Sequence, residues 1–304
     1  MSVPELYYQV EHLFEFSESE TKRVGTGIPE VDKLIKGPAP GEICMIMGRS
    51  YSGKSIIGQN IINYNRNVPS IFFSLEMPAM QALIRLYSMW SDTPSGEVQN
   101  AVESGDPPAD LWDIPNAFKN HAIVDTPGIT MAQMSQEVEE FADRHGTKPE
   151  FVVVDYMELL GGAKASGEGY LATEAQSTML KDWARQEEMR VFVLHQTNRQ
   201  EKQWMPPTED SARNAGFTEA DFVIGLWRPH NDPKLDHIER LRLKNKIACN
   251  VLKNRPYFLS MARHDISITP SLRVWRQEDQ SDSRTTNDER TEEPRENPSP
   301  FPGA

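Results

Sequence analysis

Residues 43–55 read ICMIMGRSYSGKS: an apolar segment, then the pattern Gly-x-x-x-x-Gly-Lys-Ser, then a segment typical of a helix. Gly48 and Gly53 permit backbone conformations that a side chain would obstruct, so successive N–H groups can point inward at phosphate oxygens. A helix that begins near Lys54 adds the positive end of its dipole. Lys54 would neutralise charge on the β- and γ-phosphates, and the Ser55 hydroxyl would bind Mg²⁺. The stretch predicts the phosphate-binding loop of an NTPase.

Length and composition are those of a folded chain with one large or two small domains. Of 304 residues, 38 % are hydrophobic and 25 % are charged, which suffices for a sizeable core. No apolar run reaches the roughly 18 residues of a transmembrane helix, and the N-terminal residues lack the pattern of a signal peptide. Cys44 and Cys249 fall in predicted strands and are expected to be buried in a reducing compartment.

The net charge of −13 argues against a role in coating a polyanion. Residues 277–304 carry eight acidic side chains and three arginines, so they account for −5 of this charge and residues 1–276 for −8. A few basic residues around a channel can still bind single-stranded DNA, because affinity depends on local phosphate neutralisation. Net charge alone does not decide between these functions.

Hydrophobic periodicity divides the chain into three parts. Residues 1–24 predict a leader helix, which packs either on its own core or in a groove of a neighbouring subunit. Residues 25–276 alternate apolar runs with helical stretches, the pattern of an α/β fold with a central, mostly parallel sheet flanked by helices. Residues 277–304 are acidic and poor in apolar side chains, which predicts disorder.

The elements of the middle part follow from the same pattern. The predicted strands are 42–47, 70–74, 121–124, 151–155, 191–195, 222–227 and 248–253, followed by a strand-rich end at 257–275. The predicted helices are 54–64, 78–90, 131–145 and 173–188, with short helices within 91–118.

Two carboxylates follow predicted strands, where open α/β sheets bind their ligands. Asp155 ends an apolar run and is placed to hold Mg²⁺ beside the phosphate loop. Glu76 comes directly after another strand and is placed to orient and deprotonate the attacking water, although a solvated residue before the next helix would look the same. Glu158, three residues after Asp155, is the alternative base.

Gln196 also follows an apolar strand, where it would hydrogen-bond the γ-phosphate and move when that group leaves. The polar segment after it includes Arg199, Arg213, Asn214 and Gly216. Such a long segment indicates either a functional loop or a solvated one.

Lys253 and Arg255 end a later strand. An arginine there can reach the γ-phosphate of a neighbouring subunit, as arginine fingers do in trans. An ordinary surface pair is the alternative interpretation.

In their order, these motifs resemble the C-terminal ATPase domain of the DnaB-type replicative helicases, which has a RecA-like fold. The similarity spans roughly residues 25–260, and the motifs are specific together rather than singly. The matching stretches are TGIPEVD at 26–32, PGE at 40–42, the phosphate loop, SLEMP at 74–78, DTPGIT at 125–130, VDY at 154–156, LK at 180–181 with Ala184, QTNR at 196–199 and KNR at 253–255.

The resemblance implies an enzyme that couples ATP hydrolysis, with Mg²⁺, to the unwinding of DNA. It implies single-stranded DNA and further copies of the chain as partners, assembled in a ring that is expected to be a hexamer, in the cytoplasm of a bacterium or a phage-infected cell. The implied nucleotide-binding residues are Gly48, Arg49, Ser50, Gly53, Lys54, Ser55 and, in trans, Lys253. The implied catalytic residues are Lys54, Glu76, Gln196 and Arg255, with Ser55 and Asp155 at the metal and Arg199, Arg213, Asn214 and Gly216 at the DNA.

The chain departs from the family pattern in two respects. Glu158 stands where the family commonly has an amide. Family members carry a helical N-terminal domain that forms a collar and meets primase, whereas about 25 residues precede the ATPase region here. Contact with primase or with a helicase loader is therefore an open expectation. The alternatives are a filament-forming RecA-type recombinase or mediator, and a loader or regulatory ATPase that does not translocate.

Overall fold

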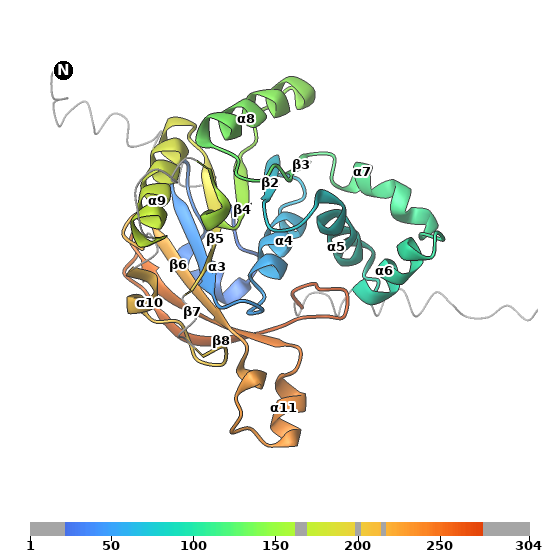
Figure 1. The fold of residues 1–304 in the computed structure, drawn as a ribbon, viewed down its shortest axis with the longest axis vertical. Coiled ribbons are helices and arrows are strands. Elements are labelled where there is room, and N and C mark those ends of the chain that lie inside the picture. The colour runs from blue at the N-terminus through green and yellow to red at the C-terminus, as the bar shows by residue number, and fades with distance from the viewer. Residues whose placement is uncertain (1–21, 162–168, 198–201, 214–216, 276–304) are drawn as a thin grey trace, which may run out of the picture. The chain divides into compact units, whose positions relative to one another are not determined.

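The computed structural model describes residues 22–161, 169–197, 202–213 and 217–275, so most of the predicted leader helix and acidic tail lie outside the described residues (Figure 1). The chain divides into two units, Met1–Val274 and Trp275–Ala304. The first unit is built on an eight-stranded sheet. Its strands are β1 Ile43–Gly48, β2 Ser70–Ser74, β3 His121–Val124, β4 Phe151–Asp155, β5 Arg190–Gln196, β6 Phe222–Trp227, β7 Lys246–Asn254 and β8 Met261–Ser267.

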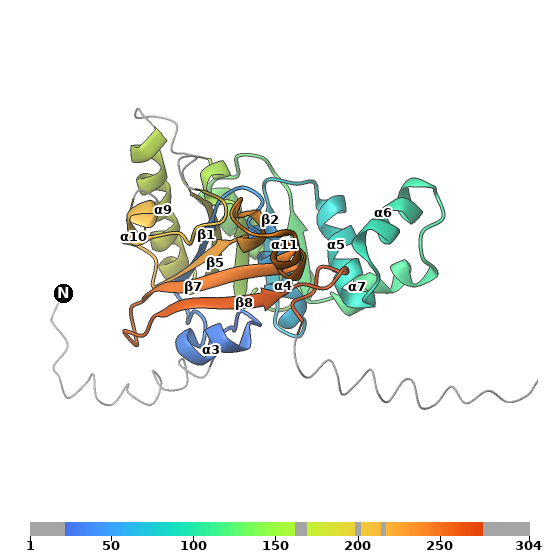
Figure 2. The same cartoon turned by 90° about the horizontal axis from the view of Figure 1, so that it is seen from below.

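The sheet has the order β3-β2-β4-β5-β1-β6-β7-β8, and its first six strands run parallel. Strands β7 and β8 lie side by side at one edge of the sheet (Figure 2). Strands β7 and β8 are antiparallel to their neighbours: β7 pairs with β6, from which residues 228–245 return to the same edge of the sheet, and β8 pairs with β7. This confirms the predicted α/β fold with a mostly parallel sheet.

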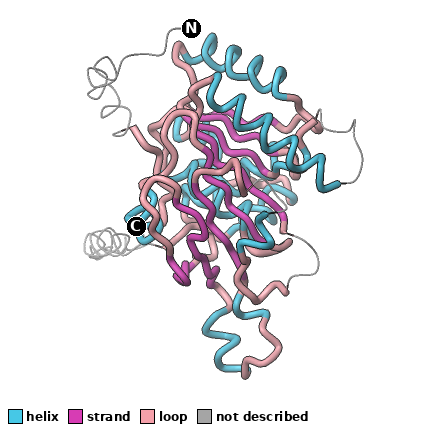
Figure 3. The backbone as a smooth tube through the Cα atoms, turned by 90° about the vertical axis from the view of Figure 1, so that its left-hand side faces the viewer, coloured by secondary structure: helices cyan, strands magenta, loops and turns pink. Residues whose placement is uncertain are grey.

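Helices cover both faces of the sheet, as the parallel topology requires (Figure 3). Along β1, Cys44 and Ile46 pack in one buried cluster with residues of α4 and α5, whereas Met45 and Met47 pack in a second cluster with residues of α8 and α9. The alternation follows from the two-residue period of a strand, and burial of both faces explains why the central strands are almost wholly apolar.

The helices are short and several were not expected from the sequence. They are α3 Pro29–Ile35, α4 Lys54–Tyr64, α5 Ala79–Ser91, α6 Ser95–Glu103, α7 Ile114–Ala117, α8 Met131–His145, α9 Gly169–Gln186, α10 Glu209–Arg213 and α11 His237–Leu243, with 3₁₀ turns η1 Ala109–Asp113, η2 Met157–Leu159 and η3 Pro229–Asn231. The sequence argument predicts α4, α5, α8, most of α9 and short helices where α6 and α7 lie, but it misses α3, α10 and α11. Helix α11 has only seven residues and buries none of them, and its apolar side chains Ile238 and Leu241 are exposed, so it is too short to give a clear periodic pattern.

The packed unit already includes Arg23 and Val24, two residues before position 25. Val24 is 4 % exposed within the core, and Arg23 Nη1 donates a hydrogen bond of 2.6 Å to the carboxylate of Glu42. Among the described residues, no helix has both the length and the apolar character to span a membrane.

Candidate nucleotide-binding site

The carboxyl ends of four neighbouring parallel strands meet at one edge of the sheet. Gly48 at the end of β1 is in register with Gln196 at the end of β5, and Ser74 at the end of β2 is in register with Asp155 at the end of β4. Glu76 follows β2, and its backbone N–H donates to the Asp155 carbonyl at 3.1 Å. The topology therefore gathers the residues that the sequence predicts at the phosphates and the metal.

The phosphate loop between β1 and α4 can be formed only with glycine at two positions. A Cβ on Gly48 would lie 2.5 Å from the Leu226 carbonyl oxygen. Gly53 has a φ of +100°, and a Cβ there would lie 2.3 Å from Cδ1 of Ile247. Both contacts are shorter than atoms tolerate, so the glycines allow the loop to pack against β6 and β7 and to expose its N–H groups.

Lys54, the first residue of α4, is buried beneath this loop. Its Nζ donates to the Gly48 carbonyl at 2.9 Å and to the Arg49 carbonyl at 3.0 Å, so the ammonium lies within the curve of the loop. Burial lowers the pKa of Lys54, and the negative charges of Asp155, Glu158 and Glu76 oppose that shift. A cation held here is placed to neutralise phosphate oxygens.

Asp155 is a buried carboxylate whose two oxygens have no hydrogen-bond partner among the described residues. Burial raises its pKa to about 6, although the neighbouring Ser55 hydroxyl and the Lys54 ammonium pull it down. An orphaned carboxylate beside a serine hydroxyl fits Mg²⁺, which binds one or two protein oxygens and completes its shell with water and substrate phosphates. No group of three or more His, Cys, Asp or Glu within the described part of the chain could hold a metal by itself.

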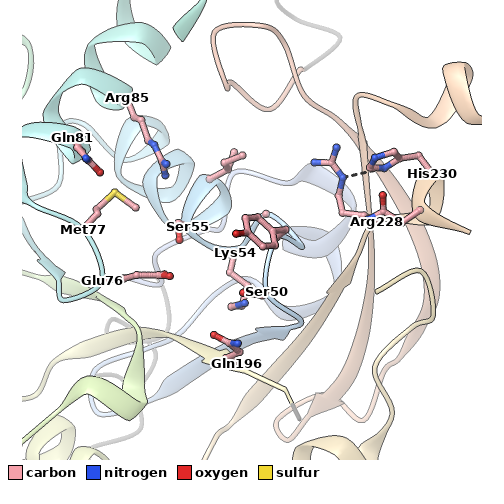
Figure 4. Close-up of a pocket in the computed structure, with 14 residues that line it drawn as sticks. Ser50, Lys54, Ser55, Glu76, Met77, Gln81, Arg85, Gln196, Arg228 and His230 are labelled. Atoms are coloured by element: carbon pink, nitrogen blue, oxygen red, sulfur yellow. Dashed lines mark hydrogen bonds between the residues drawn. The ribbon is translucent and has the colours of Figure 1, made fainter. Parts of the chain in front are cut away.

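The two candidate bases occupy different surroundings. Glu76 is exposed and lines the cavity in front of the phosphate loop, with its carboxylate pointing into it (Figure 4). Glu158 is half-buried, and its Oε1 accepts the backbone N–H of Gln196 at 3.0 Å. The geometry favours Glu76 as the group that meets the attacking water.

The cavity itself has a volume of about 680 Å³, which is enough for a nucleotide. Its described lining includes the predicted residues Ser50, Gly53, Lys54, Ser55, Glu76 and Gln196. It also includes residues that sequence reasoning missed, namely Gln81, Arg85, Arg228, His230 and Asn231. Arg228 follows the parallel strand β6 directly, so the strand-end rule that found Glu76 could have found it; Gln81 and Arg85 face the same side of α5, four residues apart.

Gln203 connects three parts of the site. Its Nε2 donates to the Ser50 carbonyl of the phosphate loop at 3.4 Å, and its Oε1 accepts from Nδ2 of Asn231 at 3.2 Å. Its carbonyl accepts the N–H of Arg228 at 3.1 Å. The segment after β5 is thereby attached to both the phosphate loop and the start of η3.

Lys253 and Arg255 are not among the described residues that line this cavity. Lys253 Nζ donates to the Phe217 carbonyl at 2.6 Å, and Arg255 Nη2 donates to the Thr218 carbonyl at 3.0 Å. Both cations therefore contact the segment before β6 in their own chain. Of the predicted DNA-binding residues, Arg213 is the last residue of α10, while Arg199, Asn214 and Gly216 lie outside the described residues.

The parallel sheet, the glycine loop and the carboxylates at its edge have the arrangement of a RecA-like P-loop ATPase fold. The profile of the DnaB-like helicase C terminal domain matches residues 23–258, and the chain belongs to this family. The replicative DNA helicase DnaB of Leifsonia xyli subsp. xyli is 27 % identical over 219 residues, covering 67 % of this chain and 46 % of that protein. The chain thus spans about half the length of the curated relatives it matches.

Solved structures show the same fold. The ATPase domain of G40P superimposes with a TM-score of 0.73 at 20 % identity, covering 89 % of this chain and 98 % of that one. A DnaB-like replicative helicase whose interactions with primase were studied superimposes with a TM-score of 0.71 at 20 % identity, covering 90 % of this chain and 67 % of that one.

Proposed function

We propose that this chain is the ATP-hydrolysing motor of a replicative helicase, which moves along single-stranded DNA and unwinds duplex at a replication fork. We propose further that it works as a ring of identical subunits, expected to be a hexamer. The observation that carries the proposal is the buried, unpartnered carboxylate of Asp155 beside Ser55 and Lys54, at the edge where Glu76 lines the cavity. Membership of the DnaB-like family supports it.

In this mechanism the phosphates of ATP lie against the loop at the start of α4. Lys54 and the N-terminal N–H groups of the helix stabilise negative charge that develops on the γ-phosphate. Glu76 accepts a proton from the water whose oxygen forms the new bond to phosphorus, while the bond to the β-phosphate oxygen breaks. Ser55 and Asp155 would hold Mg²⁺, and the bound ion would supply positive charge at the phosphate oxygens.

Lys253 and Arg255 would complete the site of a neighbouring subunit. Their place outside the cavity of their own chain supports a role in trans, since a cation on one subunit can reach a γ-phosphate on the next across a ring interface. Hydrolysis would then depend on assembly as well as on the residues of one chain.

Coupling to DNA would pass through Gln196. This residue lines the cavity, and the chain continues from it into the segment that contains Arg199 and Arg213 to Gly216. Loss of the γ-phosphate would release the Gln196 side chain and loosen one contact with the DNA backbone. Contact with primase or with a helicase loader stays an open expectation of the family resemblance.

The test is ATP hydrolysis by the purified chain with and without single-stranded DNA, together with Glu76→Gln. We expect DNA to stimulate hydrolysis several-fold, and we expect the variant to hydrolyse ATP about 10²- to 10⁴-fold more slowly than wild type. Equal rates of ATP hydrolysis with and without single-stranded DNA would contradict the proposed motor function and favour a loader or regulatory ATPase. Filaments instead of rings in electron micrographs would favour a recombinase.

A further inference from the structure

Glu158 contacts the end of β5 at the residue next to the cavity. It lies in η2, three residues after Asp155, and its Oε1 accepts the backbone N–H of Gln196 at 3.0 Å. The same oxygen lies 2.6 Å from Nδ1 of the buried His195. One carboxylate oxygen thus meets two consecutive residues of β5.

The sheet itself leaves this N–H group without a strand partner. The ladder between β4 and β5 ends at the pair Val154 and Val193, so beyond it β4 supplies no carbonyl to Gln196. On the other side of β5, the N–H of Thr197 donates to the Gly48 carbonyl at 3.2 Å. The end of β5 is therefore held between the phosphate loop on one side and the Glu158 side chain on the other.

The Gln196 side chain starts from this clamped backbone and lines the nucleotide cavity (Figure 4). A shift of the backbone by a fraction of a hydrogen-bond length would move the amide relative to a bound γ-phosphate. A side chain that hydrogen-bonds a γ-phosphate needs a backbone held in a fixed position, because catalytic interactions depend steeply on the positions of the interacting atoms.

We propose that Glu158 is a positioning residue: through its hydrogen bond with the Gln196 N–H it fixes the end of β5, so that the Gln196 amide meets the γ-phosphate. This inference rests on the proposed function for the role of Gln196 and assigns Glu158 a part other than that of base. Its Oε2 is buried and has no hydrogen-bond partner among the described residues, so the contact with β5 is made through Oε1.

Two substitutions separate positioning from base catalysis. Glu158→Gln keeps an Oε1 that can accept the Gln196 N–H, so we expect its kcat for ATP hydrolysis to stay within about threefold of wild type. Glu158→Ala removes the acceptor, so we expect kcat to fall about tenfold while KM for ATP changes less than about twofold. Glu139→Ala, which removes an exposed carboxylate of α8, is the matched control and should change neither constant. Loss of activity in Glu158→Gln as severe as in Glu76→Gln would overturn the proposal.

A double-mutant cycle tests whether Glu158 acts through Gln196. If it does, adding Glu158→Ala to Gln196→Ala should lower kcat by less than about twofold further, because the residue being positioned is already missing. Fully additive losses would show that Glu158 acts by another route and would contradict the proposal.

Hydrogen exchange gives a readout that needs no hydrolysis. In the full chain, the Gln196 amide should exchange faster in Glu158→Ala and at the wild-type rate in Glu158→Gln, while the Val191 amide, which donates to Glu42, serves as an internal reference. If the Gln196 amide exchanges at the wild-type rate in Glu158→Ala, the Glu158 side chain does not hold the end of β5 and the proposal is wrong. A wild-type protein that fails to hydrolyse ATP refutes the proposed function but leaves this exchange measurement valid.

Discussion

Asp221 and Arg255 form an ion pair of 3.1 Å in which the carboxylate is buried and the guanidinium is half exposed. Oδ2 of the same carboxylate accepts the Ile43 N–H at 2.9 Å and the Lys181 ammonium at 2.6 Å. Asp221 is thus a structural centre between β1, α9 and β6, whereas Arg255 is attached at its edge and can leave with little loss of packing. Because Asp221 is buried and Arg255 is half exposed, Asp221 has a role in folding, whereas Arg255 can take the proposed catalytic role.

Arg255→Ala should leave the fold intact but stop hydrolysis in the assembled protein. The exposed side of the ion pair contributes less than about 1 kcal/mol to the free energy of unfolding, which urea denaturation measures. If Arg255 acts in trans, mixing Arg255→Ala with Lys54→Ala should restore part of the ATPase activity, because some interfaces then join an intact Lys54 to an intact Arg255. Mixtures as inactive as the separate variants would exclude the trans arrangement.

Asp221→Ala should destabilise the protein strongly. It leaves the Lys181 ammonium and the Ile43 N–H without their buried acceptor, which costs about 3 kcal/mol of unfolding free energy. Asp182→Ala removes an exposed carboxylate from α9 and is the matched control, with an expected change below about 0.5 kcal/mol. Equal urea midpoints for the two variants would show that Asp221 has no such structural role.

Asp155→Asn should stabilise the protein in the absence of Mg²⁺. Folding raises the pKa of Asp155 from 3.8 to about 6, so the folded state favours the protonated form and ionisation above that pH costs stability. The free energy of unfolding of the variant should therefore exceed that of wild type by about 1 to 3 kcal/mol near neutral pH. This difference should vanish as the pH falls to about 4.

Urea denaturation across this pH range measures the effect of Asp155. Added Mg²⁺ with nucleotide should stabilise the wild type more than Asp155→Asn, since ligands stabilise the state that binds them. A difference between the two proteins that stays constant with pH would show that Asp155 does not titrate in this range.

Gly53→Ala should damage the protein more than a glycine substitution at a position with an ordinary left-handed backbone and open space around it. Gly53 and Gly146 both have positive φ, +100° and +69°, but a Cβ at Gly146 meets open space whereas one at Gly53 meets Ile247. We expect Gly146→Ala to cost about 1 kcal/mol, and Gly53→Ala to cost about 2 to 4 kcal/mol and to weaken nucleotide binding. Equal thermal stability of the two variants would contradict the packing argument.

The strands and the phosphate loop could be predicted because buried parallel strands are continuous apolar runs. The predicted strands at 70–74, 121–124, 151–155 and 222–227 have the bounds of β2, β3, β4 and β6, and α4 begins at Lys54 as the loop motif requires. The strand-end rule also predicted that Glu76, Asp155 and Gln196 would meet at one edge, where the structure brings them together.

Other parts of the site depend on contacts that local patterns do not encode. Helix α11 is seven residues long and its apolar side chains Ile238 and Leu241 are exposed, although Asp236 and Glu239 form a capping box at its start. The contact of Glu158 with Gln196 joins η2 to the end of β5 through a side chain, and the pairing of Arg255 with Asp221 joins the residue after β7 to the residue before β6. Such relationships follow from strand order, which the sequence pattern leaves open.

The most direct test of the motor is displacement of a DNA strand from a forked duplex by the purified chain, comparing wild type with Lys54→Ala. Lys54 holds the centre of the phosphate loop, and its removal should abolish nucleotide-driven movement without unfolding the sheet. We predict displacement that requires ATP and Mg²⁺ in the wild type and none in the variant. Displacement by Lys54→Ala at the wild-type rate would contradict a motor driven from this site.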